Sequence, residues 1–201
     1  MKITSLDRIL LFITGLLAGY QIAIGIDKMD STSIIAYTIA FGVILVAGLL
    51  LIILGFEALD SPIVVIISTI IPLTLSLGLV WQHLASFRSP YLLFTIIGFL
   101  AVTLTRSIPI QNKLPIITIA ITHGIAGMTI FLLPLILSFQ GKVNPLFSLV
   151  GIGGALIGVL GILLSFLKTG KPILSRDTIM RVFPILLLLT TALFVAGFKY
   201  G

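Results

Sequence analysis

Cysteine is absent from the 201 residues, and charged residues are scarce. Without cysteine there are no disulfides, thiolate metal sites, iron–sulfur clusters or cysteine nucleophile. Charged residues make up 9% of the chain, whereas a soluble domain carries about 25%. Hydrophobic residues make up 59%, and the mean hydropathy is +1.31. The composition therefore predicts an integral membrane protein with the lipid bilayer as its partner and solvent.

Long apolar runs fill most of the chain, and polar or proline-containing connectors separate them. A membrane-spanning helix needs about 20 apolar residues. Seven runs are long enough, and we expect helices near 9–26, 34–56, 62–85, 91–108, 115–139, 145–167 and 179–198. The predicted fold class is therefore all-α, a polytopic helical protein with one membrane domain over residues 1–201. This arrangement leaves no room for a soluble catalytic domain.

The distribution of basic residues predicts the orientation in the membrane. With seven helices, eight basic residues fall on the side of the N-terminus: Lys2, Arg8, Arg106, Lys113, Lys168, Lys171, Arg176 and Arg181. Four fall on the other side: Lys28, Arg88, Lys142 and Lys199. Cytoplasmic loops carry the excess of basic residues, so we expect a cytoplasmic N-terminus and an external C-terminus, in the plasma membrane. The net charge of +6 therefore indicates membrane topology and not a nucleic-acid partner.

The first apolar run could be mistaken for a signal peptide because it follows basic residues. It is too long for the apolar region of a signal peptide, and no convincing small-x-small cleavage site follows it. We therefore expect it to be retained as a membrane helix.

Two parts of the chain resemble one another when they are aligned. A shift of 108 places residues 13–22 over residues 121–130, with five of ten positions identical. Shifts of 110 and 112 align the second helix with the sixth and the third with the seventh. The pattern predicts parallel repeats, 1–85 and 115–199, joined by a linker helix at 91–108. Chance alignment of apolar residues is the alternative.

Ionisable residues inside the predicted spans are almost absent. No carboxylate lies at mid-membrane, which argues against a proton or sodium pump driven by Asp or Glu. Lys199 lies at the end of the last helix, so a retinal Schiff base at its centre is excluded. His83 and His123 would be about 18–20 Å apart along the membrane normal, too far to share one metal or haem. We therefore expect no cofactor, metal site or catalytic residue, and the sequence favours a protein that is not an enzyme.

A few polar residues inside the spans are the candidates for binding a substrate. Thr14 and Gln21 lie in the first helix, and Thr122, His123 and Thr129 lie in the fifth. If the repeat is real, these five residues face a shared central seam. A neutral His123, hydrogen-bonded to a threonine or a backbone carbonyl, is the structural alternative to a ligand contact or proton relay.

Prolines and glycines mark further features of the helices. Pro72 and Pro184 predict helix breaks that line a path, with ordinary kinks as the alternative. Gly15-x-x-x-Gly19 and the glycine-rich sixth helix are close-packing motifs. They predict either packing within the chain or a face for a homo-oligomer or for subunits of a membrane complex.

Two functions fit these observations. The first is a small transporter or facilitator of a weakly polar or neutral solute, which passes between two three-helix repeats. The second is a non-catalytic structural or accessory subunit of a larger membrane complex.

Overall fold

The computed structural model of the chain describes residues 3–26, 29–108, 113–168 and 173–200. Three residues of the charge count, Lys2, Lys28 and Lys171, lie outside these ranges. In the described part the chain is helical, without strands, and seven helices are long and apolar enough to cross a membrane. They are α1 Ser5–Ile24, α2 Ser31–Leu54, α3 Pro62–His83, α4 Arg88–Ser107, α5 Leu114–Phe139, α6 Ser148–Lys168 and α7 Arg176–Tyr200. The all-α polytopic fold predicted from the sequence is confirmed.

The helix ends follow ordinary capping chemistry. The Thr4 side chain accepts the backbone N–H of Asp7, and the Asp7 carboxylate accepts the backbone N–H of Thr4, which forms a capping box. This pairing explains why Asp7 is buried. Gly25 and Gly55 end α1 and α2 with φ of 69° and 74°, a conformation that glycine adopts without strain. Short 3₁₀ turns complete three connections: η1 Phe56–Asp60, η2 Ala85–Phe87 and η3 Pro145–Phe147.

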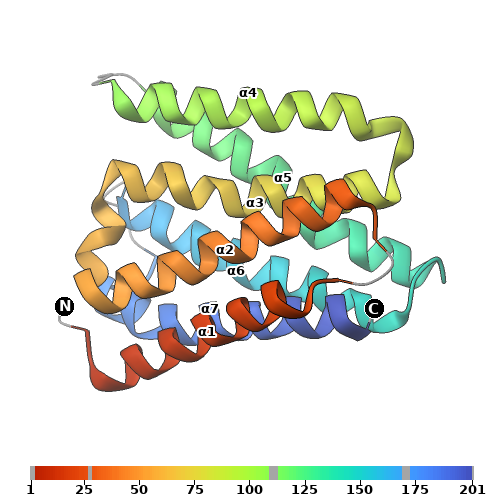
Figure 1. The fold of residues 1–201 in the computed structure, drawn as a ribbon. Helices are drawn as coiled ribbons and strands as arrows, with labels where there is room; N and C mark the ends of the chain where they lie inside the picture. The colour runs from red at the N-terminus through yellow and green to blue at the C-terminus, as the bar shows by residue number, and fades with distance from the viewer. Residues whose placement is uncertain (1–2, 27–28, 109–112, 169–172, 201) are drawn as a thin grey trace.

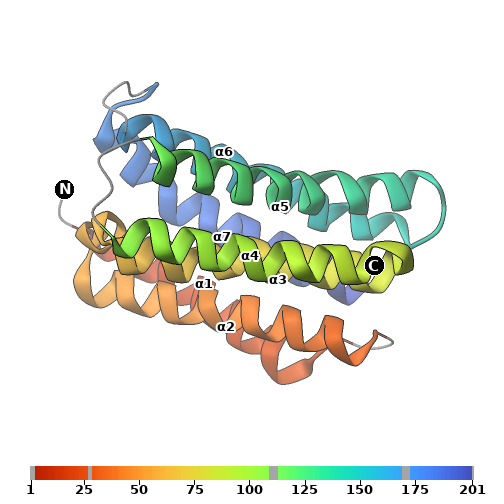
Figure 2. The same ribbon diagram turned by 90° about the horizontal axis from the view of Figure 1, so that it is seen from above.

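Six of these helices form a closed ring, and α4 lies outside it. Around the ring each helix contacts the next in the order α1, α2, α3, α5, α6, α7 and back to α1. The remaining helix, α4, packs on α3 and α5 at the edge of the bundle (Figure 1). In the view from above, α1 and α2 lie on one side, α5 and α6 lie on the other, and α3 and α7 lie between them (Figure 2).

The contact order of the ring has two-fold symmetry. Exchanging α1, α2 and α3 with α5, α6 and α7 turns the α1–α2 contact into α5–α6 and the α2–α3 contact into α6–α7. The same exchange turns the α3–α5 contact into α7–α1. Two parallel repeats around an axis along the membrane normal give this order. The arrangement is compatible with the repeat, which stays a prediction.

The centre of the ring is packed with apolar side chains. Toward the C-terminal end of α7, the rings of Tyr37, Phe41 and Phe147 surround Phe198, at centroid distances of 4.4, 6.2 and 6.1 Å. We call these four residues the aromatic cluster. Nearer the N-terminus, a second buried cluster joins α1, α2, α6 and α7, with members that include Leu11, Leu51, Leu160, Phe183 and Leu187. The interior is therefore apolar along most of its length.

Both prolines predicted to break helices lie within continuous helix. The α-helical structure of α3 and α7 runs through Pro72 and Pro184, so the predicted helix breaks are wrong at both positions. Each proline removes one backbone donor, but the residues that follow Pro72 are buried and hold the helix in place. The Ser76 hydroxyl donates to the Pro72 carbonyl at 2.6 Å.

Three glycines of α6 are used for packing within the chain. A Cβ at Gly151 would lie 2.6 Å from the Phe131 carbonyl oxygen, and a Cβ at Gly154 would lie 2.7 Å from Ile130 Cγ2. A Cβ at Gly153 would lie 2.9 Å from the Phe194 ring. These contacts bring α6 close to α5 and α7, as small residues do in membrane bundles. Gly158 is exposed, and a Cβ there would meet nothing within 4 Å.

Candidate functional site

Most buried hydroxyl groups donate a hydrogen bond to a backbone carbonyl of their own helix. Thr14, Thr69, Thr95 and Thr191 each donate to the backbone carbonyl four residues earlier, at 2.8–2.9 Å. This bond is the usual solution for threonine in an apolar helix. These side chains have already used their donor, which makes them weak candidates for holding a solute.

Three buried polar side chains have an atom without a hydrogen-bond partner and lie on neighbouring helices. They are Gln21 of α1, Tyr37 of α2 and Thr190 of α7, with exposed fractions of 2%, 1% and 1%. No hydrogen bond is made by three of their atoms: Gln21 Oε1, the Tyr37 hydroxyl oxygen and Thr190 Oγ1. We call these residues the central polar set. An enclosed polar group without a partner costs about 1–3 kcal/mol, so three of them mark a candidate binding site.

Contacts place the central polar set on the inward faces of α1, α2 and α7. The helix α1 contacts both α2 and α7, and the Tyr37 ring packs on Phe198 of α7. Thr190 lies one turn before Phe194 of α7, and a Cβ at Gly153 of α6 would lie 3.2 Å from the Thr190 carbonyl oxygen. Gln21 follows Ala18 by one turn, and Ala18 belongs to the same buried cluster as Tyr37. Each of the three residues is therefore buried on a helix of the ring, and Tyr37 belongs to the aromatic cluster.

The Gln21 amide and the Tyr37 ring are held in fixed orientations. Gln21 Nε2 donates to the Gly25 carbonyl at 2.8 Å, which leaves Oε1 as the available acceptor. The Tyr37 ring lies against Gly78 of α3, where a Cβ would be 2.5 Å from Cε1. Ser33, one turn before Tyr37, donates to the Gly78 carbonyl at 3.1 Å and holds α2 against α3. The site therefore presents a preorganised neutral acceptor, a phenol hydroxyl and an alcohol.

The five residues predicted to line one seam fall into two groups. Thr14 and Gln21 are buried in α1, which contacts α2 and α7. Thr129 and Thr122 face α4: the Tyr91 hydroxyl donates to Thr129 Oγ1 at 3.1 Å, and a Cβ at Gly98 would lie 3.1 Å from Thr122 Cγ2. The single seam predicted from the sequence is therefore wrong, because α4 covers the polar face of α5.

His123 lies in the second group and is half-buried. Its Nδ1 atom is enclosed and makes no hydrogen bond of normal geometry. Its electrostatic neighbours are the Ile119 carbonyl on the preceding turn and the Arg106 guanidinium of α4. His123 therefore lies on the part of α5 that is near α4, outside the central polar set.

Sequence reasoning found one member of the central polar set and missed two. Gln21 was a candidate because an amide is conspicuous in an apolar helix. Tyr37 and Thr190 lie in helices with other aromatic and hydroxyl residues, and no local signal separates an unpartnered hydroxyl from a satisfied one. In the described residues, no group of three or more His, Cys, Asp or Glu side chains is placed to hold a metal.

Comparison of the chain with protein-family models, with curated proteins and with solved structures finds no match. The functional argument therefore depends on the fold and on the central polar set.

Proposed function

We propose that the protein carries a small neutral solute across the membrane. The observation that carries this proposal is the central polar set, three enclosed polar atoms without a partner, while most other buried hydroxyls of the ring are hydrogen-bonded. An amide oxygen and two hydroxyls recognise alcohol, amide or similar groups by neutral hydrogen bonds. No charged side chain belongs to the set, which disfavours an ion as the solute.

The order of the helices supports this proposal. In transporters built from repeats, the substrate binds between the two halves. Gln21 and Tyr37 belong to the first predicted repeat, and Thr190 belongs to the second. The aromatic cluster includes Tyr37 and would close such a path on the C-terminal side of the bundle. Transport therefore requires α7 and η3 to move relative to α2, with the Phe198 contacts opening.

Swelling of proteoliposomes tests the proposal. We expect vesicles that contain the protein to swell faster than empty vesicles when glycerol, urea or a pentose enters down its gradient, as light scattering records. Gln21→Leu removes the acceptor and should slow the entry of the recognised solute about tenfold, the value of one hydrogen bond of about 1.4 kcal/mol.

Thr103→Val is the control, because the Thr103 hydroxyl donates to the Phe99 carbonyl within α4, outside the ring. This variant should match the wild-type rate. Equal swelling of protein-containing and empty vesicles with all three solutes would contradict the proposal. A loss of swelling in Thr103→Val as large as that in Gln21→Leu would remove Gln21 from the path.

An accessory subunit of a larger membrane complex is the second candidate. The apolar packing at the centre of the ring favours it, since a scaffold needs no path for a solute. Purification in a mild detergent, followed by mass determination of the intact particle, separates the two candidates. A stoichiometric complex with other polypeptides supports the subunit, and a particle of this chain alone supports the transporter.

We also propose that the N-terminus is cytoplasmic and the C-terminus is external, in the plasma membrane. Eight basic residues on the N-terminal side against four on the other support this orientation. Because the chain has no cysteine, a single cysteine introduced at Ser5 or at Tyr200 reports its side without background. In intact cells we expect a membrane-impermeant maleimide to label Tyr200→Cys but not Ser5→Cys. The reverse pattern would invert the topology.

A further inference from the structure

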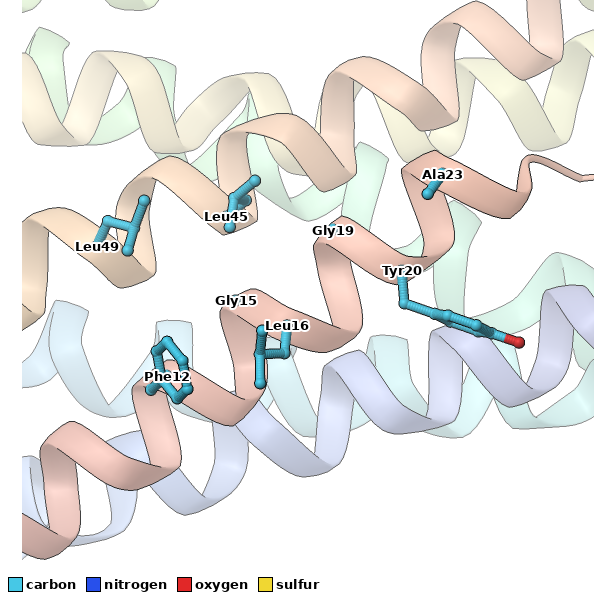
Figure 3. Close-up of a pocket in the computed structure, with 8 residues that line it drawn as sticks. All are labelled: Phe12, Gly15, Leu16, Gly19, Tyr20, Ala23, Leu45 and Leu49. Carbon is cyan, nitrogen blue, oxygen red and sulfur yellow. The ribbon is translucent and has the colours of Figure 1, made fainter.

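A narrow apolar groove runs along the lipid-facing side of α1 and α2. Its volume is about 390 Å³. Small residues of α1 form its floor, and larger side chains of α1 and α2 form its walls (Figure 3). The floor is Gly15, Gly19 and Ala23, and the walls are Phe12, Leu16, Tyr20, Leu45 and Leu49. Along α1 the floor extends for about 12 Å.

The small residues of the floor are not used for close packing along the whole groove. Near the start of α1 the helices are close, since a Cβ at Gly48 of α2 would lie 3.4 Å from the Leu11 carbonyl oxygen. Further toward the C-terminal end of α1, a Cβ at Gly19 would meet nothing within 4 Å. In the two-fold order of the ring, the α1–α2 contact corresponds to the α5–α6 contact. There, Gly151 and Gly154 bring α6 into close contact with α5. The groove is therefore a local opening between α1 and α2.

A cation lies beside Tyr20, on the flank of α1 that faces α7, where the Tyr20 hydroxyl points (Figure 3). Lys199 Nζ of α7 donates to the hydroxyl of Tyr20, a wall residue, at 2.9 Å. The ammonium also lies 5.5 Å from the ring centroids of Tyr20 and Tyr200. Among the described residues, the ion pair is Arg176 with Asp60, on the opposite side of the membrane, and Lys199 pairs with no carboxylate. The ammonium is therefore available to an anion at the membrane surface.

We propose that the groove binds one acyl chain of an anionic phospholipid, whose phosphate pairs with Lys199. The apolar walls match a hydrocarbon chain, and the Lys199 ammonium, next to the wall residue Tyr20, matches the charge of a phosphate. The walls also disfavour a helix as the occupant. Phe12, Leu16 and Tyr20 are 53%, 57% and 41% exposed and flank the floor, which keeps a second backbone away from the glycines.

Native mass spectrometry with defined lipids tests this proposal. The purified protein is delipidated in detergent and then mixed with phosphatidylglycerol or phosphatidylcholine of the same chain length. We expect the wild type to retain phosphatidylglycerol about fivefold more strongly, the contribution of one basic residue at an anionic surface. Lys199→Gln should remove this preference, whereas Lys142→Gln, at an exposed lysine outside the groove, should keep it.

A second pair of variants tests the groove itself. Gly19→Leu places a large side chain on the floor of the groove. We therefore expect this variant to retain one lipid molecule fewer than the wild type, with phosphatidylglycerol as with phosphatidylcholine. Gly158→Leu, at a glycine of α6 that also faces open space, should retain the wild-type number and shows that an added leucine is tolerated. Unchanged lipid retention in Gly19→Leu would overturn the proposal. Disulfide-linked dimers of Gly19→Cys in vesicles would also overturn it, in favour of a second copy of the chain in the groove.

Discussion

Gly154→Ala is expected to lower the free energy of unfolding by about 1–3 kcal/mol, and Gly158→Ala is expected to raise it by about 1 kcal/mol at most. Both glycines belong to one Gly-x-x-x-Gly motif of α6, so the local sequence context is matched. At Gly154 the new methyl group would lie 2.7 Å from Ile130 Cγ2 and 3.1 Å from backbone atoms of α5. Ile130 is buried, so it has little room to move away.

Thermal unfolding in detergent micelles, followed by the fluorescence of the single tryptophan, Trp81, measures both variants. At Gly158 the methyl group meets open space, and the gain in helix propensity of alanine over glycine remains. A lower unfolding temperature for Gly154→Ala alone would support the packing of α6 on α5. Equal shifts for the two variants would contradict this account of the motif.

Tyr37→Phe is expected to stabilise the protein by about 1–3 kcal/mol and to reduce solute entry. The Tyr37 hydroxyl is fully enclosed without a partner, so its removal relieves an unpaired polar group. The ring would keep its contacts with Gly78 and Phe198. If the hydroxyl binds solute, the same change removes a recognition group, and stability and activity move in opposite directions.

Tyr91→Phe is the matched control, because the Tyr91 hydroxyl has a partner. It donates to Thr129 Oγ1 across the α4–α5 contact, and the loss of such a bond in a membrane bundle costs about 0.6 kcal/mol. The unfolding temperature and the swelling of proteoliposomes are measured for both variants. Destabilisation by Tyr37→Phe would show that its hydroxyl is engaged in the protein. Higher stability with unchanged swelling would remove Tyr37 from the path.

The spans of the helices could be predicted from the sequence because hydropathy reports burial in lipid directly. The fifth helix was expected at 115–139 and is observed at Leu114–Phe139. The fourth was expected to begin at 91, but it begins at Arg88, so Pro90 lies in its first turn. Proline is tolerated in the first turn, where its missing N–H has no partner in the helix. A proline near a helix start therefore does not fix the boundary.

The position of the candidate site could be predicted only in part. Periodicity indicates which residues share a face, but it does not say which helix that face meets. Thr122 and Thr129 share a polar face as expected, but α4 covers it. The helix breaks expected at Pro72 and Pro184 are not observed for the same reason, because the packing of neighbouring residues decides whether a helix continues through a proline. Whether the hydroxyls of Tyr37 and Thr190 are paired depends on atoms of other helices.

The place of α4 outside the ring has a consequence for how its sequence can vary. A chain whose two halves point the same way must cross the bilayer once more between them, and α4 supplies that return crossing. Its requirements are length and an apolar surface, which many sequences meet. Only the strip that touches α3 and α5, with Gly98 and Tyr91, is tied to specific neighbours. We therefore expect related chains to differ most in the lipid-facing residues of α4 and least on that strip.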